Sequence, residues 1–364
     1  MPLARSRPFY LMIAVVVLIS IATQQGYASN PSGIESVAAL DLSKLPAGTK
    51  NSSAASIAFV SDTSFAIGLC DMGAGKGCSL TLLRRDGNLL RPYASTSSFR
   101  PGRAIHASSD GRILITPFAG YPAMLFTPDL SERQELPHVF LASQSGNTAA
   151  DITKEGWTLY RVKPILELIR VGKGSLRSIS DEAVVFQDDK VMHVETVQGA
   201  HLGSFSVKPE DKCYNTAYPL GTNKLYLDDC KKIRIVDFSG RRVAELHRPK
   251  GYGARQLWSE DGKRILFHNF GRKISISRNA GEIALAVGTL GAGVADEQSN
   301  REEVLVLDTP TGNKCFDWRR SFPEGSVGLP QDAAISASGK FVAIAANGTL
   351  SVYRLPEVCS SSKQ

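Results

Sequence analysis

The stretch AIHASSDGRILITPF, residues 104–118, consists of two short apolar runs joined by a Ser-Asp-Gly turn. The same pattern returns in QLWSEDGKRILFHNF at residues 256–270 and in DAAISASGKFVAIAANG at residues 332–348. The three stretches align on the tetrapeptides SSDG, SEDG and SASG. Short apolar runs bounded by such turn residues are typical of β-hairpins. The recurrence therefore indicates an internal repeat whose unit begins with a hairpin.

Four weaker copies of the unit start at Ser56, Ala149, Leu176 and Thr216. Each unit continues into a second segment of alternating apolar residues, which is clearest in IRIVDFSGRRVAEL from Ile233. Alternation with a period of two predicts strands that bury one face. Four short strands in a unit of about 48 residues are the pattern of a propeller blade. Seven such units fill the chain after its N-terminal segment, so the sequence predicts a seven-bladed β-propeller.

With these repeats the chain resembles bacterial secreted β-propellers of the WD-repeat and YVTN-repeat type, although no Trp-Asp dipeptide closes a repeat. The stretch IESVAALDLSKL from Ile34 is similar to a late strand of a blade. We expect it to form the outermost strand of the last blade and to close the ring, because closure removes a free sheet edge. Residues 269–302 have little blade character and are expected to form a long insertion in blade six, either a packed cover or a binding flap.

The N-terminus has the pattern of a secretory signal peptide. Arg5 and Arg7 precede an uncharged, mostly apolar run at residues 10–22, and Gly26 and Ala28 supply small residues for cleavage. We expect cleavage after Ala28, which leaves residues 29–364 as the mature propeller. An uncleaved anchor stays open as an alternative, although a membrane span needs roughly 20 residues. No other apolar run is long enough to span, so the protein is predicted to be secreted or periplasmic.

All six cysteines lie in the predicted mature chain, and an even number in an exported protein indicates disulfides. Their spacing suggests three pairs: Cys70–Cys78, Cys213–Cys230 and Cys315–Cys359. The first pair encloses the glycine-rich stretch GLCDMGAGKGCSL, residues 68–80, which lacks the Ser or Thr that follows the lysine of a phosphate-binding loop. We interpret it as a disulfide-closed loop between the second and third strands of the first blade.

The composition and motifs favour no nucleic-acid or catalytic role. The formal net charge is +7, but the basic residues are scattered in pairs rather than gathered in a stripe with stacking aromatics. The sequence contains no HExxH or CxxC spacing for a metal and no GxSxG nucleophile elbow. We therefore predict no metal, no cofactor and no catalytic set.

A binding surface is expected where the inner strands begin, on the face opposite the Ser-Asp-Gly turns. The strand register places the following candidates on that face or on the adjoining loops: Arg103, His106, Tyr121, Tyr214, Tyr252, Arg255 and Asp332. This mixed polar and aromatic set suits a peptide, a glycan or a small anion. The alternative is that these groups bind one another and channel water, because buried polar groups normally have partners.

These observations favour a non-enzymatic binding scaffold with a protein, peptide or glycan partner in the cell envelope or outside the cell. Two alternatives stay open. One is a propeller enzyme with its site in the channel, similar to a lactonase or a glycan lyase. The other is an envelope assembly component that docks through the insertion.

Overall fold

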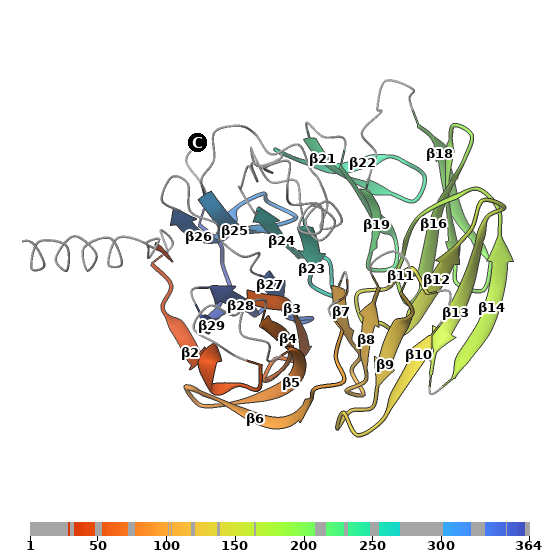
Figure 1. The fold of residues 1–364 in the computed structure, drawn as a ribbon. Helices are drawn as coiled ribbons and strands as arrows, with labels where there is room; N and C mark the ends of the chain where they lie inside the picture. Colours follow the sequence, from red (N-terminus) through yellow and green to blue (C-terminus); the bar gives the residue numbers. More distant parts are fainter. Residues whose placement is uncertain are drawn as a thin grey trace, which may run out of the picture.

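The computed structural model describes residues 28–29, 33–47, 53–71, 77–100, 102, 104–117, 121–136, 139–163, 165–207, 216–228, 232–247, 255–269, 301–321, 332–346 and 348–360 (Figure 1). Across these ranges the chain forms β-strands and one short 3-10 helix at Leu42–Lys44. Within the same ranges, no helix is both long enough and apolar enough to cross a membrane.

Five separate sheets have the strand order and size of propeller blades. The first two contain β7 (Ala104–Ala107), β8 (Ile113–Thr116), β9 (Ala123–Phe126) and β10 (Arg133–Leu136), then β11 (Leu141–Ala142), β12 (Thr148–Ile152), β13 (Trp157–Val162) and β14 (Leu166–Gly172). The next two contain β15 (Ser175–Ile179), β16 (Ala183–Asp188), β17 (Val191–Thr196) and β18 (His201–Ser206), then β19 (Thr216–Leu220), β20 (Lys224–Asp228), β21 (Lys232–Asp237) and β22 (Arg242–His247). The fifth contains β23 (Arg255–Trp258), β24 (Arg264–Asn269), β25 (Arg301–Asp308), β26 (Lys314–Ser321) and, on its outer edge, β1 (Ala28–Ser29).

The remaining strands form one eight-stranded sheet. It contains β3 (Ser53–Ser61), β4 (Ser64–Asp71), β5 (Gly77–Asp86) and β6 (Leu89–Thr96), together with β27 (Asp332–Ile335), β28 (Phe341–Ala346), β29 (Thr349–Arg354) and β2 (Ser36–Asp41). As expected for the segment from Ile34, β2 pairs antiparallel with β29. It also pairs in parallel with β6, through Ala39 and Leu89, and so joins the two groups of four strands.

The all-β propeller fold is thus present, but the predicted count of seven blades is wrong. The described strands make five separate blades and one continuous eight-stranded sheet. The count failed because an apolar pattern locates strands along the chain and carries no information on lateral hydrogen bonds between neighbouring repeats. Here a single parallel bridge between β2 and β6 joins two groups of four strands into one sheet.

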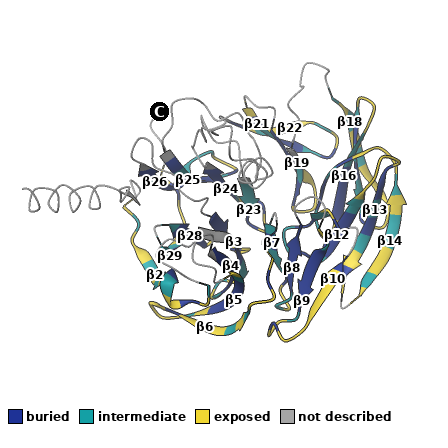
Figure 2. Ribbon diagram, in the orientation of Figure 1, coloured by how far each residue is buried: buried dark blue, intermediate teal, exposed yellow. Residues whose placement is uncertain are grey.

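Most hydrophobic clusters lie between neighbouring sheets. Ile113 and Ile115 of β8 pack against Leu80 and Leu82 of β5, and Trp157 of β13 packs against the next sheet. The two halves of the eight-stranded sheet also meet through such a cluster. Figure 2 shows the result, with inner strands buried and outer strands such as β6 and β14 largely exposed. Because apolar burial contributes about 25 cal/mol per Å², contacts between sheets hold the ring together.

The repeated turn that the sequence predicted recurs with one geometry between the first two strands of several sheets. In each copy the glycine N–H donates to the carbonyl of the serine three residues earlier, at 2.9–3.0 Å. The glycines all have a φ between 66° and 88°, which is favourable only without a side chain. The four copies are Ser108–Gly111, Ser143–Gly146, Ser259–Gly262 and Ser336–Gly339. We call the end of the propeller that carries them the turn end, and the opposite end the loop end.

One copy, SQSG at residues 143–146, was not aligned from the sequence. The unit placed at Ala149 begins one strand too late, because TKEG at residues 153–156 joins β12 to β13 rather than β11 to β12. The inner strand of this sheet, β11, has only two residues, Leu141 and Ala142. So short a strand leaves little apolar pattern to align.

Two of the three predicted disulfides are present. Cys70–Cys78 joins the end of β4 to the start of β5, as expected for the loop between those strands. Cys315–Cys359 joins β26 to the C-terminal segment. Cys213 and Cys230 lie outside the described residues, as do the predicted signal segment up to residue 27 and residues 270–300 of the predicted insertion.

Candidate functional site in the central channel

A cavity of about 600 Å³ lies where the inner strands β3, β7, β11, β19, β23 and β27 converge. Its wall consists mainly of the later residues of these strands and the turns after them, for example Ser143, Ser259 and Ala337, together with all of β7. The cavity is therefore at the turn end. The sequence placed the binding surface at the loop end instead.

Stacked aromatic rings form one wall of this cavity. The Tyr218 ring of β19 lies parallel to the Trp258 ring of β23, with centroids 4.1 Å apart and an interplanar angle of 1°. Tyr226 meets the same indole edge-on at 5.3 Å. Burial raises the pKa of Tyr218, so its hydroxyl is protonated at neutral pH. This wall is flat, apolar and uncharged.

Gln144 connects two inner strands that are far apart in the sequence. Its side-chain Nε2 donates to the Trp258 carbonyl at 2.5 Å, and its Oε1 accepts from the Trp258 N–H at 3.1 Å. The amide therefore pairs with the backbone of β23 much as a neighbouring strand would. This contact fixes the indole position and joins the turn after β11 to the opposite wall.

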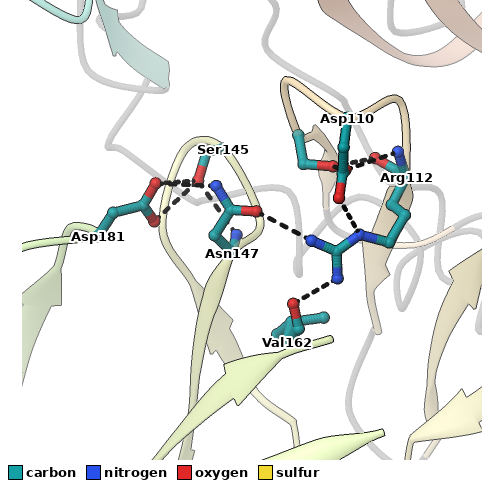
Figure 3. Close-up of polar contacts among 7 residues, drawn as sticks. Asp110, Arg112, Ser145, Asn147, Val162 and Asp181 are labelled. Carbon is teal, nitrogen blue, oxygen red and sulfur yellow. Dashed lines mark hydrogen bonds and ion pairs between the residues drawn. The ribbon is translucent and has the colours of Figure 1, made fainter. Parts of the chain in front are cut away.

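The charged residues that line the cavity are acidic. Asp181, Glu182 and Glu260 contribute carboxylates, and the described lining contains no lysine or arginine. Asp181 is held by neighbours: its Oδ2 accepts from the Ser145 hydroxyl at 2.6 Å and from Asn147 Nδ2 at 3.1 Å (Figure 3). In a chain with a net charge of +7, this lining gives the cavity a sign opposite to that of the whole protein.

Asn147 also links this carboxylate to the preceding sheet. Its Oδ1 accepts from Arg112 at 3.4 Å, while Arg112 donates to the Val162 carbonyl at 2.5 Å and pairs with Asp110 at 2.8 Å (Figure 3). Polar side chains thus connect three consecutive sheets around the mouth of the cavity. Because these bonds fix the turns, the carboxylate at the rim has a defined position.

The residues proposed from the sequence are distributed differently. His106 lines the cavity, with its Nε2 3.4 Å from the Thr116 hydroxyl. Tyr121 is exposed on the connection between β8 and β9. Arg255 begins β23 opposite His268, and its side chain is not described. Arg103, Tyr214 and Tyr252 lie outside the described residues.

Asp332, the remaining candidate, is buried at the loop end in an ionic cluster. Its Oδ2 accepts from the Ile57 N–H at 2.6 Å, and its Oδ1 lies 3.9 Å from His268 Nδ1. His268 Nε2 contacts Glu302 at 2.9 Å, and Glu302 lies 3.7 Å from Arg320. None of the four ionisable side chains is more than 10% exposed. The cluster joins β24, β25 and β26 to β27 and β3.

Five residues of the cavity were not predicted from the sequence as site residues: Gln144, Asp181, Tyr218, Trp258 and Glu260. A usable signal existed for two of them, because Gln144 and Glu260 each lie inside a copy of the Ser-x-x-Gly turn. The others become neighbours only when the ring closes. Within the residues that the structure describes, no group of three or more His, Cys, Asp or Glu side chains is arranged to hold a metal ion.

Comparisons with known proteins find similar chains among solved structures. No protein-family model matches the chain, and no curated protein matches it. Among solved structures, the crystal structure of the C-terminal WD40 domain of Sif2 is similar, with 12% sequence identity and a TM-score of 0.48. The match covers 89% of this chain and 98% of that one.

Proposed function

We propose that this protein is an extracytoplasmic, non-enzymatic interaction scaffold that binds a basic segment of a partner protein in the cavity at the turn end. The observation that carries the proposal is the lining: it contains carboxylates and stacked aromatic rings, and its described residues include no lysine or arginine. The two disulfides support a location in an oxidising compartment.

The chemistry of the wall selects for lysine or arginine side chains. Their aliphatic stems can lie against Tyr218 and Trp258, and their charged groups can reach the carboxylates of Glu182 and Glu260 at the rim. A negative cavity on a positive protein also guides a basic segment to this one place and repels acidic ones. Selectivity by charge is therefore the property to test.

The test uses two fluorescent seven-residue peptides, one alternating lysine with serine and one alternating glutamate with serine. We expect the lysine peptide to bind at least tenfold more tightly by fluorescence anisotropy, with an affinity that falls as salt rises. The double variant Glu182→Gln/Glu260→Gln should weaken that binding about tenfold, since each tenfold step corresponds to about 1.4 kcal/mol. Both side chains are exposed, so the fold should tolerate the changes.

The matched control is Glu135→Gln, which removes an exposed carboxylate from the outer strand β10. It should leave the affinity for the lysine peptide unchanged. Equal binding of both peptides, or an unchanged affinity in the double variant, would refute the proposal.

A further inference from the structure

The outer strand β14 presents an open, apolar edge. Its sheet has the order β11-β12-β13-β14, so among the described strands the backbone of β14 is paired on one side only. Leu168 and Val171 of β14 are 61% and 68% exposed, and Ile165 just before the strand is 70% exposed. Figure 2 shows this strand as an exposed ribbon at the rim of the molecule. An exposed apolar edge of this kind is a template for pairing with another strand.

A β-bulge aligns these apolar side chains. Leu168 pairs with Tyr160 and Val171 pairs with Thr158, with the register shifted between Leu159 and Tyr160. Since Thr158 and Tyr160 are two residues apart, they share one face of the sheet. Leu168 and Val171 therefore also share a face, which a regular strand would not allow for residues three apart. The bulge creates an apolar strip beside the open edge.

Of the other outer edges in the described part of the molecule, some are covered or polar, and β18 and β22 carry one exposed aliphatic residue each, Leu202 and Val243. The edge of β26 pairs with β1, through Ala28 with Arg320 and Ser29 with Arg319. The edge of β29 is covered by β2. On β10 the exposed residues are polar or charged: Arg133, Gln134 and Glu135. The fold thus accepts added strands at its outer edges, and β14 combines an open edge with exposed apolar side chains.

The charge around β14 favours one kind of occupant. Residues 154–173 contain five basic and two acidic residues. Glu167 pairs with Lys163 at 3.2 Å, and Arg170 pairs with Glu195 of the neighbouring sheet at 2.6 Å. The local excess of positive charge would bring like charges together if two copies of this edge paired. An acidic strand would complement it.

We propose that β14 is a docking edge for an extended, acidic segment of a partner protein, which adds to the sheet as a further strand. Main-chain hydrogen bonds would supply affinity, and alternate side chains of the segment would cover Leu168 and Val171. This surface is separate from the channel cavity and selects for the opposite charge. The proposal for β14 and the proposal for the cavity can therefore be tested independently.

The test uses two fluorescent heptapeptides, one alternating glutamate with valine and one alternating lysine with valine. We expect the glutamate peptide to bind at least tenfold more tightly, and hydrogen exchange to show protection of the β14 amides on binding. The variant Leu168→Ser/Val171→Ser should weaken binding about tenfold. The matched control Val243→Ser, at a half-exposed position on the outer strand β22, should not.

The proposal would be overturned by equal binding of the two peptides, by unchanged binding of the double variant, or by protection away from β14. Concentration-dependent dimerisation that the double variant abolishes would make a second copy the occupant and would also overturn it. Light scattering of the wild-type protein and of the double variant, each without peptide, detects such dimerisation. Circular dichroism of each variant checks that the fold is retained, as expected for exposed positions.

Discussion

The two ends of the propeller are built in different ways. At the turn end, short Ser-x-x-Gly hairpins repeat with the same backbone hydrogen bonds, and local geometry fixes their shape. At the loop end, the buried side chains of His268, Glu302, Arg320 and Asp332 join separate strands. The backbone bonds of these turns do not involve the exposed carboxylates of Glu182 and Glu260 at the cavity rim. Buried charges therefore hold the loop end together, whereas these two exposed carboxylates at the turn end are available for recognition.

Removing one buried charge should give a large loss of stability. Glu302→Gln retains the side-chain shape but removes the negative charge of Glu302 from beside His268 and Arg320. We expect the free energy of unfolding to fall by about 3 kcal/mol, because breaking a buried ion pair from one side leaves uncompensated charge. The exposed Glu182→Gln at the turn end should cost less than about 0.5 kcal/mol. Urea denaturation measures the free energy of unfolding of both variants. Equal losses would contradict the difference between the two ends.

The two disulfides should stabilise the protein to different extents, because they close loops of different length in the unfolded chain. Cys315–Cys359 spans a sequence separation of 44 residues and Cys70–Cys78 one of 8. Loop-closure entropy predicts a loss of about 4 kcal/mol for replacing the first pair by serine and about 2.5 kcal/mol for the second. The difference, about 1.5 kcal/mol, is the quantity to measure by denaturation of the two double variants. A larger loss from the shorter loop would contradict this entropic account.

A smaller effect is expected from the turn glycines. Gly146 has a φ of +75°, and a Cβ placed there would lie 3.0 Å from the His106 Cβ. Gly146→Ala should therefore lower the free energy of unfolding by about 1–2 kcal/mol. Gly221→Ala is the matched control, since Gly221 also has a positive φ but has open space around it. Thermal unfolding that ranks Gly221→Ala as the more damaging change would show that local crowding does not matter here.

Much of the fold could be predicted from the sequence, because hairpin turns and alternation are local signals. The turn at residues 108–111 and the strand after Ile34 are examples. The blade count could not be predicted, because the bridge between Ala39 and Leu89 joins distant segments. The site was harder still. Gln144 and Trp258 are 114 residues apart, and no local sequence pattern predicts their contact. Asp332 carries a charge that suits a ligand, but it is buried against the backbone.

The most direct test of the central claim is hydrogen exchange of the wild-type protein with and without the lysine peptide. The claim is that ligands enter at the turn end of the channel. Protection should appear in residues 143–147, 180–182 and 256–260, which line that end. The strand ends around the buried cluster should exchange at unchanged rates. Protection confined to the loop end, or no protection while the peptide is bound, would contradict the account.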